Sequence, residues 1–164
     1  MDWGAAEEAA ARGNPSEQFD FAERCVRESE EEGRWARAAP WYRKAAESDH
    51  PGAQLAFGLM CQRGEGVPQD NAEGIRWLRR AALAGETSAQ YHLGVTYYRA
   101  SLWNLTPDEL NPKHEAYKWL RLAANHGYSG AEGTCEMASL RMTHDEVAAA
   151  NRASEDFIPA KQPQ

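Results

Sequence analysis

The sequence has 164 residues, 42% of them hydrophobic and 26% charged, which is a composition typical of one globular domain with a sizeable core. The net charge is −7, so the basic patch that nucleic-acid binding needs is not expected, and neither is a nucleic-acid partner. No stretch is apolar enough to span a membrane and the start, MDWGAAEEAA, does not resemble a signal peptide, so we expect a cytoplasmic chain with no membrane partner.

The residues that commonly carry chemistry are scattered. Cys25, Cys61 and Cys135 are an odd number without close pairs, which predicts reduced, buried thiols rather than a disulfide framework or a zinc site. The five histidines also lie far apart in the sequence. The chain contains no phosphate-binding or catalytic motif. We therefore expect no metal, no cofactor and no enzymatic activity.

Helical periodicity and end signals predict eight helices and no strand. The expected ranges are roughly 15–32, 35–47, 51–63, 70–84, 88–99, 112–126, 130–142 and 144–156. Within the first of them, the acidic run ESEEEG (28–33) is either a solvated helix face or a site for a basic partner. Pro40 conflicts with the second range, because an interior proline removes a hydrogen bond, so that helix either begins near Ala38 or kinks.

Several residues predict where helices begin and end. Pro51 suits a first helical turn. Gly85 and Gly127 follow alanine-rich helices, as glycines at helix C-termini do. The segments TSAQ (87–90), SGAE (129–132) and THDE (143–146) each have the pattern of a capping box.

The chain contains an internal repeat. When Trp77 is aligned with Trp119, the small residues that follow also coincide: Ala81, Ala82, Gly85 and Ala89 align with Ala123, Ala124, Gly127 and Ala131. A step of 36 residues back from Trp77 gives Trp41, followed by Ala45, Ala46 and Ala53. Helical pairs that recur in this way bury their apolar sides by stacking on one another.

The segment AQLAFGLMCQRGEGVPQDNAEGIRWLRRAALAG (53–85) resembles a SEL-1-like repeat, which is a relative of the tetratricopeptide repeat. The motif comprises Ala53, Gly58, Gly64, Gly66, Val67, Asp70, Ala72, Trp77, Leu78, Ala81, Ala82 and Gly85. The unit 89–127 keeps most of this motif but has ASLWNLTPDELNPK (100–113) where GEGVPQD should stand, and the unit 17–50 is closer to the shorter tetratricopeptide pattern.

The resemblance implies an all-α fold, a right-handed α-solenoid of about four helix-turn-helix repeats. We expect a single repeat domain over 1–157, with an N-terminal capping segment at 1–14 and a C-terminal capping helix at 142–157. A disordered tail is expected at 158–164, and the chain is expected to be a monomer.

In the related tetratricopeptide fold, the first helix of each pair lines the concave face, and this implies a partner-binding groove here. The residues that map to the groove are Leu55, Leu59, Gln62, Arg63, Tyr91, Val95, Tyr98, Arg99, Met137 and Arg141. Aromatic residues, Met and Arg are enriched at protein interfaces, although each apolar residue of this set can instead pack between repeats. The three arginines would form a ladder able to hold partner carboxylates or a chain terminus.

The insertion 100–113 is a second candidate site, because insertions in repeat arrays often lie on the binding face. Its Trp103 either contacts a partner or closes the core as a plug. The resemblance implies a protein–protein interaction module, an adaptor or scaffold. The alternative that it implies is a bacterial immunity protein that binds and neutralises a cognate secreted toxin, with an enzyme as a distant third.

Overall fold

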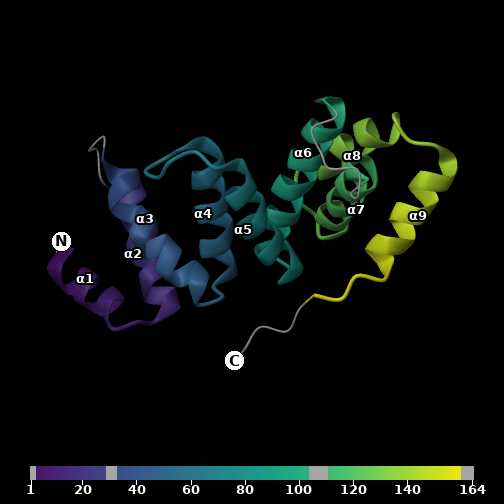
Figure 1. Ribbon diagram of the computed structural model, residues 1–164. Coiled ribbons are helices and arrows are strands. Elements are labelled where there is room, and N and C mark those ends of the chain that lie inside the picture. Colours follow the sequence, from purple (N-terminus) through teal and green to yellow (C-terminus); the bar gives the residue numbers. More distant parts are fainter. Residues whose placement is uncertain (1–2, 29–32, 104–110, 160–164) are drawn as a thin grey trace. The chain divides into compact units, whose positions relative to one another are not determined.

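The computed structural model describes residues 3–28, 33–103 and 111–159. These residues form nine helices and no strand (Figure 1), which confirms the all-α class. The helices are α1 (Trp3–Ala11), α2 (Pro15–Glu28), α3 (Arg34–Glu47), α4 (Pro51–Arg63), α5 (Asn71–Leu83), α6 (Thr87–Trp103), α7 (Pro112–Asn125), α8 (Ala131–Ser139) and α9 (His144–Glu155).

Three of these helices differ from the expectation. The sequence did not predict α1, although its run of alanines and glutamates favours a helix. Helix α6 continues to Trp103, four residues beyond the expected end, and α8 ends at Ser139, three residues early. The acidic run at 28–33 lies largely outside the described residues.

The chain divides into two compact units, of which unit 1 ends at Ala81 and unit 2 begins at Ala82. In unit 1, each of α1, α2 and α3 contacts the next helix, and Phe21, Tyr42, Phe57 and Met60 are among the residues of the core. In unit 2, α7 contacts α6, α8 and α9, and α6 also contacts α8. The core there includes Tyr117, Leu120, Cys135, Ala138 and Ala150.

One hydrogen bond recurs between successive repeats. The side-chain amide of Gln54 donates to the carbonyl of Ala46, and Gln90, 36 residues later, donates to Ala82. The same step back from Gln54 leads to Gln18, which is also buried and whose amide oxygen has no partner among the described residues. The glutamine position therefore places α2 in the repeat register that the sequence comparison had already given for α4 and α6.

The turns that precede α2, α4, α6 and α8 share a backbone conformation. The backbone has positive φ at Gly13, Asp49, Gly85 and Gly127, which are spaced by 36, 36 and 42 residues. After α3 and α7, the amides of His50 and Tyr128 bond back to the carbonyls of Ala45 and Ala123. This is the Schellman arrangement, in which a left-handed residue ends the helix. Gly13 extends the series to the end of α1, so α1 corresponds to the second helix of a repeat.

The predicted helix ends have mixed outcomes. Pro51 begins α4 as expected, and THDE (143–146) forms the capping box at α9. The prediction for TSAQ (87–90) is wrong, because Gln90 uses its side chain on Ala82 and Glu86 accepts the Ser88 amide instead. The prediction for SGAE (129–132) is also wrong, because the cap residue is Gly130, which has no side chain to cap the helix.

Pro40 and the cysteines can also be compared with the expectation. Helix α3 begins at Arg34, so Pro40 lies inside it, and the predicted start near Ala38 is wrong.

The three cysteines are free and buried, as predicted, and burial raises the pKa of each thiol. Among the described helices, none has both the length and the apolar composition needed to cross a membrane.

Candidate interaction surface

The predicted groove residues of unit 1 comprise three half-buried side chains and one exposed arginine. Leu55, Leu59 and Gln62 are half-buried on α4, and the stem of Gln62 lies against Gly74 of α5. Arg63 is exposed, and its guanidinium lies 3.6 Å from the carboxylate of Glu65. Within unit 1, Gln62 therefore has a packing contact and Arg63 has an acidic partner.

The predicted aromatic residues of unit 2 also pack within their unit. Tyr91, Val95 and Tyr98 of α6 lie against the core that contains Tyr117 and Leu120. The ring of Tyr91 stacks on that of Tyr128, with the ring centroids 4.5 Å apart. These three residues therefore have the packing role that the sequence had left open.

The remaining predicted residues of unit 2 are exposed. Trp103, at the end of α6, is 73% exposed, so its ring does not close the core as a plug. Met137 on α8 is 50% exposed, and Leu140 in the turn after it, which the sequence reasoning did not select, is 85% exposed. Arg99 and Arg141 are exposed, and neither side chain pairs with an acid among the residues that the structure describes.

These five residues define the α6–α8 surface: Arg99, Trp103, Met137, Leu140 and Arg141. Arg99 and Arg141 stand 42 residues apart, which is the repeat step between α6 and α8, and the two helices are in contact. Arg99 lies on α6, whereas Arg141 lies in the turn two residues beyond the end of α8. The repeat therefore presents two guanidinium groups on neighbouring elements, accompanied by exposed apolar side chains.

The insertion contributes to this surface through the extension of α6. Residues 100–103 continue the helix and carry Trp103, while Asn111 caps α7 and Pro112 begins it. The segment 104–110 lies outside the described residues. Thus the part of the insertion that the structure describes is helix end rather than loop.

Chemically, the α6–α8 surface is suited to binding rather than catalysis. Guanidinium groups form forked hydrogen bonds with carboxylates, and Trp and Met supply contact area. In the described part of the chain, no cluster of three or more His, Cys, Asp or Glu side chains could hold a metal ion. The architecture defines a helical repeat protein.

The comparisons identify the family. The Sel1 repeat model matches residues 36–50, 51–86 and 87–128, which together cover more than half of the chain. The chain therefore belongs to the Sel1 repeat family, and proteins with these repeats generally mediate protein–protein interactions. A comparison with curated protein sequences gives no match.

Two solved structures have the same fold. One is c5321, described as a protective antigen present in uropathogenic Escherichia coli strains and displaying an SLR fold, with a TM-score of 0.81 and 24% identity. The other is a Sel1 repeat protein from Oxalobacter formigenes, with a TM-score of 0.68 and 22% identity. The matches cover 93% and 92% of this chain but only 31% and 59% of the other two. These likenesses establish the solenoid fold of the family.

Proposed function

We propose that this chain is a protein-interaction module that binds an acidic segment of a partner protein on the α6–α8 surface. The observation that carries the proposal is the pair Arg99 and Arg141, exposed and unpaired with any described acid in a chain whose net charge is −7. Partner carboxylates would satisfy both guanidinium groups. Trp103, Met137 and Leu140 would be covered at the same time, which is favourable because they lose contact with water.

The proposal includes three narrower expectations. The chain acts as a non-catalytic adaptor, works as a monomer, and is cytoplasmic. Identification of the captured partner as a secreted toxin would specify the adaptor as an immunity protein. The monomeric state and the absence of catalysis can be examined with the purified chain, whereas the compartment has to be examined in cells.

The test is a comparison of partner capture by two variants that carry the same change in charge. Arg99→Glu/Arg141→Glu alters the proposed surface, whereas Arg12→Glu/Arg27→Glu alters exposed arginines of unit 1. We expect a partner to be recovered with the wild type and with the unit 1 variant. Its affinity for the surface variant should fall at least tenfold, which corresponds to about 1.4 kcal/mol.

Two further measurements complete the test. Circular dichroism should show that both variants keep the helical fold, because exposed substitutions usually change stability by less than about 0.5 kcal/mol. Binding to the wild type should weaken as salt rises, since surface charge interactions are screened. Equal affinity of the two folded variants for every captured protein would contradict the proposal.

A further inference from the structure

The fourth repeat departs from the way in which the first and second helices of earlier repeats pack together. In the second and third repeats, this contact is made at a glycine of the first helix. A Cβ at Gly58 would lie 3.1 Å from Cγ of Leu78, on α5, and a Cβ at Gly94 would lie 2.7 Å from Cγ of Leu120, on α7. The equivalent residue of α8, 42 positions after Gly94, is Glu136, which is exposed. Within the part of the chain that the structure describes, α8 therefore lacks this close helix contact.

The neighbouring residues leave the same side of α8 open. Glu132 and Met137 are exposed, and a Cβ at Gly133 would meet no atom within 4 Å. Leu140, directly after the helix, is also exposed, while α9 packs on α7. These four residues and Glu136 define the outer face of α8, which has room for a further helix.

In the second repeat, the residue equivalent to Glu132 lies near a base in the last turn of the second helix. This residue is Gln54, whose side-chain amide donates to the carboxylate of Asp49 at 3.2 Å. Arg80, in the last turn of α5, donates to the same oxygen at 2.8 Å. The end of a second helix can therefore bring a guanidinium group close to this position.

The third repeat has a similar arrangement. Nδ1 of His126, at the C-cap of α7, lies 3.1 Å from Oε1 of Gln90, which is equivalent to Glu132. Because this contact joins the end of α7 to the first turn of α6, the two helices run in opposite directions. In α8 a carboxylate takes this position, so it favours a base where the earlier repeats have Arg80 and His126.

We propose that the outer face of α8 is a docking site for an amphipathic helix of a partner protein, which runs antiparallel to α8 as α7 does to α6. Charge complementarity specifies this helix. It carries Lys or Arg in its central turn opposite Glu136 and in its last turn opposite Glu132, because neither carboxylate forms an ion pair with a described residue. Its apolar side chains cover Met137 and Leu140.

The same helix can supply the acidic residues proposed for the α6–α8 surface. Because it runs antiparallel to α8, its first turn lies at the end of α8, beside Arg141. Acidic residues in a first turn are stabilised by the helix dipole. In this respect the inference rests on the proposed function, and it adds that the partner segment is a helix with bases in its later turns.

The test uses a helix of this chemistry taken from the chain itself. The probe is a peptide of residues 70–86, which contains α5, with Leu78→Lys and a side-chain cross-link opposite position 78 that holds it helical. The peptide has Glu73 in its first turn and Arg80 in its last. Binding to the full chain is followed by the methyl NMR signal of Met137, assigned from its loss in Met137→Leu.

Two variants of the full chain with the same change in charge locate the site. Glu132→Lys/Glu136→Lys alters the outer face of α8, whereas Glu8→Lys/Glu47→Lys alters exposed glutamates of unit 1. We expect the peptide to bind the wild type and the unit 1 variant within about twofold of one another. The α8 variant should bind it at least tenfold more weakly, which corresponds to about 1.4 kcal/mol.

An exchange of charges provides the rescue. A peptide that carries Leu78→Glu/Arg80→Glu should bind the α8 variant more tightly than it binds the wild type, since each carboxylate then faces a base. Circular dichroism should show that both chain variants keep the helical fold, because all four altered side chains are exposed.

The outcomes separate this inference from the proposed function. An unchanged Met137 signal, or equal affinity for the wild type and the α8 variant, overturns the inference whatever Arg99→Glu/Arg141→Glu does to partner capture. Equal binding of the peptides with and without Leu78→Lys also overturns it, because the carboxylates then do not select the helix. If the mass of the wild type alone rises with concentration and that of the α8 variant does not, a second copy of the chain occupies this face and the partner helix is wrong.

Discussion

Gly94 offers a direct test of how closely the helices of unit 2 pack. A Cβ at this position would lie 2.7 Å from Cγ and 3.0 Å from the backbone nitrogen of Leu120, on α7. A side-chain atom can move away at low cost, but the backbone nitrogen belongs to a packed helix and can move only with it. Gly94→Ala therefore forces α6 and α7 apart.

Two effects of opposite sign set the magnitude. Replacing Gly by Ala inside a helix stabilises it by about 0.5–1 kcal/mol. Overpacking a closely packed contact costs about 1–3 kcal/mol. For Gly94→Ala we expect the second effect to be larger and the free energy of unfolding to fall by about 1 kcal/mol.

Gly133 on α8 provides the matched control, because a Cβ there would meet no atom within 4 Å. Gly133→Ala has only the favourable helix effect and should raise the free energy of unfolding by about 0.5–1 kcal/mol. Both variants are measured by urea unfolding followed by circular dichroism, with unchanged dependence on denaturant as the check. If Gly94→Ala proves as stable as Gly133→Ala, the close approach of α6 and α7 is not what requires glycine.

Two further predictions concern Trp77 and Cys61. Trp77→Ala removes a half-buried ring that contacts Phe57, and it should lower the free energy of unfolding, measured with heat or urea, by about 3 kcal/mol. Trp103→Ala removes an exposed ring and should stay within about 0.5 kcal/mol of the wild type. Equal losses of stability in the two variants would contradict the assignment of Trp77 to the core. Burial, reinforced by the negative charge of Glu73, raises the pKa of the Cys61 thiol to about 11. Because the folded thiol holds its proton more tightly than the unfolded one, its contribution to stability is complete below about pH 8.5 and is lost as the pH rises toward 11. Stability measured from pH 8 to pH 11 should therefore fall less in Cys61→Ala than in the wild type, and parallel curves would contradict this.

The repeat made much of the fold predictable, because stacking requires small residues and tryptophans at fixed intervals. The 36-residue step from Trp77 located α3 to α7 and the glycine turns. It was not carried back beyond Trp41, so the sequence reasoning missed Gln18, Gly13 and the repeat identity of α1. Helix caps were less predictable, since THDE (143–146) and SGAE (129–132) have the same pattern while only the first places a hydroxyl at the cap position.

The candidate site was only partly predictable, because periodicity identifies the helix on which a side chain lies but not what covers it. Tyr91 and Arg99 belong to the same predicted set, yet Tyr91 stacks on Tyr128 and Arg99 is exposed. Leu140 was missed because it lies in a turn that the expected helix 130–142 included. The contact of Phe157 with Trp119 joins residues distant in sequence, and no local pattern indicates it.

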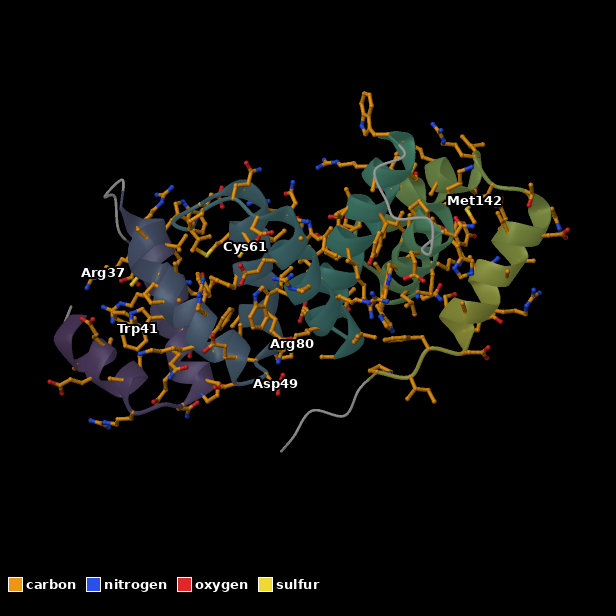
Figure 2. All side chains as sticks on the ribbon, in the orientation of Figure 1. Arg37, Trp41, Asp49, Cys61, Arg80 and Met142 are labelled. Carbon is orange, nitrogen blue, oxygen red and sulfur yellow. The ribbon has the colours of Figure 1, made fainter. Side chains whose placement is uncertain are left out.

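The two units differ in whether neighbouring side chains compensate for a residue that departs from the repeat. In unit 1, Asp49 takes the left-handed position that glycine holds in its equivalents, and the chain itself compensates. Its carboxylate accepts hydrogen bonds from Arg80, at 2.8 Å, and from Gln54, at 3.2 Å. Figure 2 shows Arg80 and Asp49 close to one another.

In unit 2, the extension of α6 adds an exposed tryptophan. The equivalent arginines, Arg99 on α6 and Arg141 in the turn after α8, form no ion pair with an acid that the structure describes. A change that the fold compensates internally is explained by stability, as Asp49 is. A change that leaves charges and large apolar side chains exposed costs stability or gains nothing from it, so a partner is the simpler physical reason for its presence. For this reason the α6–α8 surface is a better candidate for partner binding than the corresponding helices of unit 1, whose Arg63 is already paired.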